Sequence, residues 1–172
     1  MARHAPALRR SHTSRDAARQ PEIIGWKEVI SLPDWGIDGL IAKSDTGARG
    51  SAIDVRNLTV LSGDRVRFHV VLNRRDRENT REVVAPIASR VRIRSSNGQM
   101  QERYRVRTLL RIGHVEKEIE LSLVSRRNMI CRVLLGRREL SGDFLVDPEA
   151  KYRFGPRKRR HPATRNRTPA TA

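Results

Sequence analysis

The chain has 172 residues, of which 37% are apolar and only 4% are aromatic, and its formal net charge is +17. This length and composition predict one domain with a modest, aliphatic core. No apolar run approaches the roughly 20 residues that span a bilayer, and the start lacks the apolar segment of a secretory signal, so we expect a cytoplasmic protein with no membrane partner.

The positive charge is spread unevenly over three parts of the chain. Residues 1–21 carry five Arg and one Asp, residues 156–172 carry six Lys or Arg and no acid, and residues 22–155 carry the remaining +7. The two ends lack apolar periodicity, so they cannot bury enough surface to offset the entropy of ordering. We therefore expect disordered basic tails at 1–21 and 156–172 around a folded domain at 22–155. Such tails would contact nucleic acid without sequence preference.

The first motif in chain order is Asp45-Thr46-Gly47-Ala48, directly after the apolar run Leu40-Ile41-Ala42. It combines a carboxylate at a predicted strand end, a short hydroxyl that can fix a loop, and a glycine that lets another backbone approach. These are the residue types of an aspartic-protease active-site loop. The same residues are also ordinary turn formers, so a plain turn stays open at this point.

Between residues 66 and 124 the apolar pattern has a period of two, which predicts short strands rather than helices. The expected strands cover residues 68–72, 81–85, 91–94, 104–107 and 119–123. Turn signals separate the predicted strands, namely Ser62-Gly63-Asp64, Asn97-Gly98, Ile112-Gly113-His114 and Ser141-Gly142-Asp143. This spacing is typical of an all-β barrel or sandwich.

Residues 90–107 predict a β-hairpin whose turn is Ser95-Ser96-Asn97-Gly98, because alternation followed by Asn-Gly is a strong hairpin signal. Arg residues alternate with apolar residues along both arms. We expect them to form a positive stripe on one face of the hairpin. A solvated face is the simplest interpretation, and contact with an acidic substrate is the alternative.

A second motif, Leu134-Leu135-Gly136-Arg137, follows about ninety residues after the first and precedes the helix-compatible run Arg138-Glu139-Leu140. This is the only helix that the sequence predicts. The single cysteine, Cys131, lies in an apolar stretch just before it and is expected to be a buried structural thiol.

The order of these motifs resembles a retropepsin-like domain, and residues 24–154 are similar to the bacterial family labelled "ATP-dependent zinc protease". The resemblance rests on Ile24-Gly25-Trp26-Lys27-Glu28, Ser31-Leu32-Pro33-Asp34, Ala42-Lys43, residues 45–49 with Ser51-Ala52, residues 127–129 and 134–137, and Val146-Asp147-Pro148. It implies an all-β, retropepsin-like closed barrel of short strands with one short C-terminal helix.

The resemblance also assigns roles to residues. The catalytic group would be Asp45, Thr46 and Gly47. The substrate would be bound by Ala48 and Arg49 and by a flap at the hairpin turn, namely Ser95, Ser96, Asn97 and Gly98. Structural support behind the catalytic loop would come from Leu134, Leu135, Gly136 and Arg137.

A water-activating aspartic protease needs two carboxylates that share one proton. This chain contains a single Asp-Thr-Gly sequence, so we expect a twofold homodimer in which Asp45 of each copy meets its mate. Related proteins are associated with ligases that append glutamates to protein tails. Acidic or glutamate-tailed peptides are therefore the substrates that the resemblance suggests.

Neither zinc nor ATP has a recognisable motif. The sequence lacks His-Glu-x-x-His and a phosphate-binding Gly-x-x-x-x-Gly-Lys-Ser/Thr loop, so we expect no metal and no nucleotide cofactor. A structural metal site from His69, His114 and Cys131 is a minor alternative. Two other functions stay open: a non-catalytic binding module, because Ser44 and Gly50 depart from the family's apolar and Ser or Thr residues, and a nucleic-acid or ribosome-associated basic protein.

Overall fold

The computed structural model describes residues 20–94, 100–125 and 130–155. These residues form β1 (Glu22–Leu32), β2 (Ile37–Asp45), β3 (Ser51–Leu61), β4 (Arg65–Val71), β5 (Thr80–Pro86), β6 (Ser89–Arg94), β7 (Met100–Ile112), β8 (Val115–Val124), β9 (Val133–Gly136) and β10 (Phe144–Lys151). Two helical turns complete the described chain, the 3-10 turn η1 (Pro33–Trp35) and the α-helix α1 (Arg137–Leu140). Residues 1–19 and 156–172 of the expected tails, and the expected hairpin tip, lie outside the described residues.

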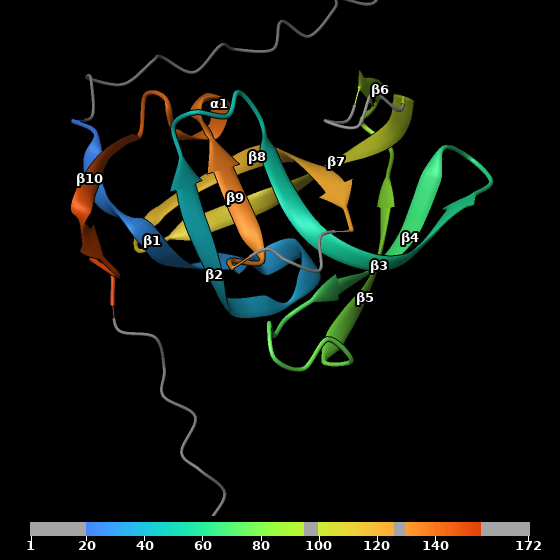
Figure 1. Cartoon of the computed structure of the whole chain (residues 1–172), viewed down its shortest axis with the longest axis horizontal. Coiled ribbons are helices and arrows are strands. Elements are labelled where there is room, and N and C mark those ends of the chain that lie inside the picture. The colour runs from blue at the N-terminus through green and yellow to red at the C-terminus, as the bar shows by residue number, and fades with distance from the viewer. Residues whose placement is uncertain (1–19, 95–99, 126–129, 156–172) are drawn as a thin grey trace, which may run out of the picture.

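Six strands close into a barrel in the order β1-β2-β9-β3-β8-β7 (Figure 1). The ring is closed by a short antiparallel contact between β7 and β1, at Ser31 and Arg111. Two of the pairings, β2 with β9 and β3 with β8, are parallel and join segments far apart in the sequence. The predicted all-β closed barrel is therefore confirmed.

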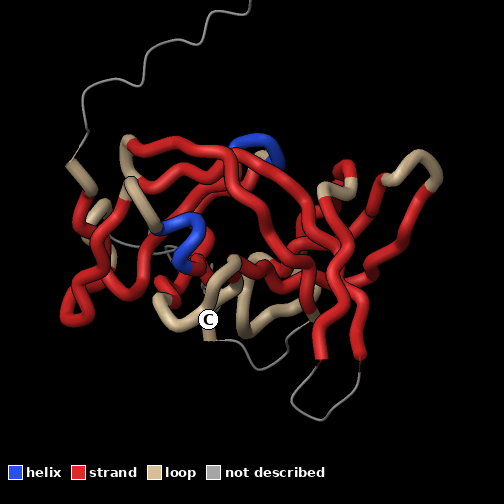
Figure 2. Tube along the Cα trace, turned by 90° about the horizontal axis from the view of Figure 1, so that it is seen from above, coloured by secondary structure: helices blue, strands red, loops and turns tan. Residues whose placement is uncertain are grey.

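Four strands lie at the margins of the barrel, and one of them, β6, pairs with β7. β4 pairs with the end of β3, and β5 pairs with β4, so that the three strands form a small second sheet that projects to one side (Figure 1). β10 adds to the outer edge of β1 in parallel. Figure 2 shows that strands make up most of the described chain and that loops and two short helical turns connect them.

The core forms because apolar side chains alternate along the strands that line it. On β8, Ile119, Leu121 and Leu123 are buried, and alternate residues of a strand share one face. The second sheet joins the same core through Phe68, which is fully buried and packs edge-on against Trp35 of η1 at 5.5 Å between ring centroids. One cluster of buried residues thus spans both sheets.

The sequence-based expectations for local structure are largely confirmed. Each expected strand lies within or overlaps β4, β5, β6, β7 or β8, and the predicted helix is α1. Gly63, Gly113 and Gly142 have the positive φ angles that their turns require. The 3-10 turn η1, which begins at a proline and is a single turn long, was not expected from the sequence. Within the described ranges, neither helical turn has the length or the apolar character needed to cross a bilayer.

Candidate functional site

Asp45 is the last residue of β2 and faces outward from the barrel wall. Ala42 and Ser44 are buried, and since side chains alternate along a strand, Asp45 lies on the opposite face from Ser44. The chain turns immediately afterwards, because the amide of Ala48 donates a hydrogen bond to the carbonyl oxygen of Asp45 at 3.2 Å. The Asp45 side chain is half-buried and residues 46–47 are exposed. The motif is therefore presented at a strand end, within reach of a ligand.

Arg137, the first residue of α1, holds this loop from the side. Its guanidinium Nη1 donates to the carbonyl oxygens of Thr46 at 2.9 Å and Gly47 at 3.1 Å. Its backbone amide donates to the carbonyl of Ala48 at 2.9 Å, and the next amide of α1 repeats this contact with Arg49. The carbonyl oxygens of this loop, which no strand of the described chain pairs with, thus accept hydrogen bonds from residues of α1.

Gly136 makes the contact between the two motifs possible. It lies directly opposite Asp45 in the parallel β2–β9 pair. A Cβ atom at Gly136 would lie 2.5 Å from the carbonyl oxygen of Gly50, which is too close for any other residue type. Its amide donates to Ser51 Oγ at 2.9 Å, and that hydroxyl donates to the buried carboxylate of Glu139 at 2.7 Å. No role for Ser51 or Glu139 could be predicted from the sequence, because only the tertiary structure brings them together.

The resemblance implied that both leucines of the second motif pack behind the catalytic loop. The structure places only Leu135 there, fully within the core. Leu134 is half-buried and lies opposite Lys43 of β2 and Ala52 of β3. Residues directly opposite one another share a face of the sheet. Leu134 therefore lies on the outward face, the same face as Asp45.

The two departures from the family pattern have different structural consequences. Ser44 is buried, and its hydroxyl donates to the carbonyl of Gly25 on β1 at 2.9 Å. The polar group is thus satisfied and ties β2 to β1 beside the loop. A Cβ atom at Gly50 would meet nothing within 4 Å, so the site has room for the Ser or Thr that relatives carry.

The hairpin predicted at residues 90–107 is formed by β6 and β7, which pair from Ser89 and Arg105 outward. Its tip, with Ser95, Ser96, Asn97 and Gly98, lies outside the described residues. The prediction of a single positive stripe is wrong. Arg90 lies opposite Tyr104, whereas Arg103 lies opposite Val91, and opposite residues share a face. The arginines of the two arms therefore lie on the two different faces of the hairpin.

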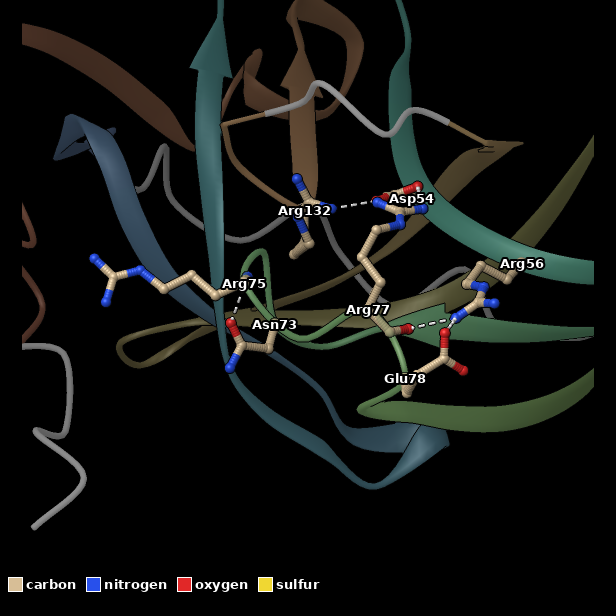
Figure 3. A network of polar contacts seen from close by, with 7 residues as sticks. All are labelled: Asp54, Arg56, Asn73, Arg75, Arg77, Glu78 and Arg132. Carbon is tan, nitrogen blue, oxygen red and sulfur yellow. Dashed lines mark hydrogen bonds and ion pairs between the residues drawn. The ribbon is translucent and has the colours of Figure 1, made fainter. Parts of the chain in front are cut away.

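A buried ionic cluster lies at the end of β9 away from the loop that follows Asp45 (Figure 3). Asp54 of β3 is fully buried and accepts hydrogen bonds from the guanidinium of Arg77 at 2.7 and 3.2 Å, and from Arg132. Burial lowers the pKa of Arg132, while the nearby Asp54 carboxylate acts in the opposite direction. The cluster joins the loop between β4 and β5 to the barrel, so its role is structural.

The described chain contains no group of three or more His, Cys, Asp or Glu side chains that could hold a metal ion. Each histidine instead contacts a glutamate: His69 Nε2 lies 3.4 Å from Glu82 Oε2, and His114 Nε2 lies 3.0 Å from Glu22 Oε1. Cys131 is buried, as predicted, and burial raises the pKa of its thiol. The alternative of a structural site from the two histidines and the cysteine is therefore not supported.

Comparison with known proteins adds a family and a fold. The family model described as "Retropepsin-like aspartic endopeptidase RimB" matches residues 23–156. A crystal structure of a protein of unknown function from Legionella pneumophila subsp. pneumophila str. Philadelphia 1 is similar, with a TM-score of 0.65 and 24% identity over 77% of this chain and 97% of that one. At this identity the likeness shows the fold alone.

Curated relatives of this chain are named as ligases rather than as endopeptidases. Proteins named "Probable alpha-L-glutamate ligase" from Shewanella halifaxensis (strain HAW-EB4) and Parasynechococcus marenigrum (strain WH8102) are 32% and 33% identical over 137 residues. The match covers 77% of this chain but only 30% and 29% of those proteins. The chain therefore spans less than a third of the length of the curated relatives it matches.

Proposed function

Because the chain belongs to the RimB-like family of retropepsin-like aspartic endopeptidases, we propose that it hydrolyses peptide bonds at a site formed when two copies bring their Asp45 carboxylates together. The observation that carries the proposal is the placement of Asp45. It is a half-buried carboxylate on the outward face at a strand end, on a loop braced by Arg137 and by the close contact at Gly136.

A single copy offers only half of the required chemistry. Two ionised carboxylates at close range repel each other, so the pair shares one proton and titrates as a unit. One chain supplies one Asp-Thr-Gly loop, and a twofold axis beside Asp45 would supply its mate. The homodimer is thus part of the proposed active site.

The proposed reaction divides the work between the two Asp45 carboxylates. The ionised carboxylate takes a proton from the attacking water, while the protonated one donates a hydrogen bond to the scissile carbonyl and stabilises the developing oxyanion. The shared proton then passes to the leaving nitrogen. Thr46 would steady the loop across the axis, Gly47 would leave room for the substrate backbone, and the β6–β7 hairpin would close over the peptide and exclude water.

The substrate class follows from charge and from the names of relatives. The domain expected at residues 22–155 carries an excess of seven positive charges, which favours acidic peptides. Relatives named as glutamate ligases contain a region similar to this chain. We propose that the protein acts on acidic or glutamate-tailed peptides, in partnership with an enzyme that adds glutamate.

Subunit mixing tests the proposal directly. Asp45→Asn removes the ionisable group while conserving its size, so the variant homodimer should lose cleavage of acidic peptides. When equal amounts of parent and Asp45→Asn are unfolded together and refolded, random pairing leaves about one quarter of the dimers with two Asp45 carboxylates. Activity should fall to about one quarter of that of the same total amount of parent protein.

The matched control is Asp64→Asn, which changes an exposed carboxylate in the turn between β3 and β4. Mixing this variant with parent should leave activity unchanged. Activity of one half in the Asp45→Asn mixture would show that each copy works alone, and would refute the composite site. Full cleavage by Asp45→Asn alone would refute the aspartic mechanism.

A further inference from the structure

Three lysines form a row across three adjacent strands. Lys27 of β1 lies opposite Lys43 of β2 on one side and opposite Lys151 of β10 on the other. Directly opposite residues share a face, and neighbouring strands lie about 4.8 Å apart. The three ammonium groups therefore project from one face of the sheet as a contiguous group, which we call the lysine row.

The lysine row lowers the stability of the isolated fold. Like charges directly opposite each other in a sheet are destabilising. Among the described residues, no carboxylate forms an ion pair with any of the three lysines, although many arginines elsewhere have such partners. The ammonium groups of Lys27 and Lys151 lie over the ring of Trp26, at 4.3 Å and 5.0 Å from its centroid. The row thus presents positive charge that the described chain does not neutralise.

The row begins beside the candidate catalytic carboxylate. Lys43 precedes Asp45 by two residues on β2, so both side chains lie on the same face and their Cα atoms are about 7 Å apart. Leu134 and Ala52 continue this face across β9 and β3. A ligand that lies across Asp45 therefore meets an ammonium group at Lys43 on one strand and an apolar side chain at Leu134 on the next.

We propose that Lys43 and Lys27, with Lys151 at the outer end, bind carboxylate side chains of an acidic peptide and so determine the specificity of the Asp45 site. This inference rests on the proposed function. An acidic substrate would be repelled by a carboxylate pair that carries negative charge, and ammonium groups on the same face offset that repulsion. The lysine row supplies the complementary charge at the place where the repulsion is greatest.

An acidic peptide fits this surface better than single-stranded nucleic acid does. Binding of unpaired bases relies on open aromatic faces for stacking. Trp26 is the aromatic residue at the row, and its ring already has two ammonium groups over it. The row therefore offers charge without a stacking platform.

The binding test separates specificity from cleavage. It uses the full chain with Asp45→Asn, so that peptides are not hydrolysed, and fluorescein-labelled hexaglutamate as the probe in an anisotropy titration. Adding Lys43→Gln should weaken binding about tenfold, or 1.4 kcal/mol, whereas Lys43→Arg should retain most of the affinity. The matched control is Arg67→Gln on β4, an exposed residue that loses the same charge roughly 20 Å away along β3. It should change binding less than twofold.

The cleavage test compares two peptides that differ only by Glu or Gln beside the scissile bond. The ratio of their kcat/KM values should fall about tenfold in Lys43→Gln and stay unchanged in Arg67→Gln, and Lys43→Glu should favour a peptide with Lys at that position.

Equal effects of Lys43→Gln and Arg67→Gln would overturn the lysine row, even if the parent cleaves peptides. Lys43-dependent hexaglutamate binding in a parent that cleaves nothing would keep the row and refute the proposed function. Loss of oligouridine binding without loss of hexaglutamate binding would overturn the row in favour of nucleic acid.

Discussion

Replacing Gly136 by alanine tests the contact that joins the two motifs. The new Cβ atom would lie 2.5, 2.6 and 2.9 Å from the O, C and N atoms of Gly50, where ordinary contacts begin at 3.4 Å. The two backbones would have to separate by about 0.9 Å, the difference between 3.4 and 2.5 Å. They cannot do so by moving a flexible side chain, because the clashing atoms all belong to the backbone.

The cost can be worked out from the contacts that such a shift would break. Overpacking of a buried site costs about 1–3 kcal/mol. Three hydrogen bonds span the same interface, from the amides of residues 136, 137 and 138 to Ser51, Ala48 and Arg49, and each contributes about 1 kcal/mol. We expect Gly136→Ala to lower the free energy of unfolding by about 4–6 kcal/mol, which corresponds to a fall in Tm of at least about 10 °C.

The assay is urea and thermal denaturation followed by far-UV circular dichroism, with Gly50→Ala as the matched control. The control adds the same methyl group on the other side of the contact, where it meets nothing within 4 Å. It should be neutral, or stabilising by up to about 1 kcal/mol, because it restricts the unfolded chain. Equal stability of the two variants would refute the close approach of these backbones, and with it the bracing of the Asp45 loop by β9 and α1.

Three further predictions concern other parts of the molecule. Asp54→Asn should lower the free energy of unfolding by about 3–5 kcal/mol, because two guanidinium groups lose their buried counter-charge. The control Asp64→Asn should have no detectable effect on stability. Similar Tm values for the two variants would contradict the ionic cluster. Since burial raises the pKa of Cys131 and only the thiolate is nucleophilic, the native chain should react with a thiol reagent at pH 8 at least about tenfold more slowly than the chain in urea; equal rates would mean an accessible thiol. Deleting residues 1–21 and 156–172 removes ten of the seventeen net positive charges and should reduce the salt dependence of nucleic-acid binding while leaving Tm unchanged; a large fall in Tm would show that the ends are structural.

Local patterns in the sequence identify the short elements and the motif that suggests the chemistry. Alternation with a period of two is produced by a strand with one buried face, so the strands around Phe68, Val83 and Leu121 could be read directly. Turn glycines identified where the strands end. The short helix could be placed because Gly136 precedes a run of good helix formers. Each of these signals depends on residues close together in the chain.

Long-range strand pairing, in contrast, sets which residues share a face or a contact. The β2–β9 pair joins residues about ninety positions apart, and it alone places Gly136 beside Asp45 and Leu134 beside Lys43. A shift of one residue in such a pairing moves every side chain to the other face, and no local pattern specifies it across so long an interval. For that reason the sequence predicted one arginine stripe where the register gives two faces, and showed three separate lysines where the folded sheet has one row.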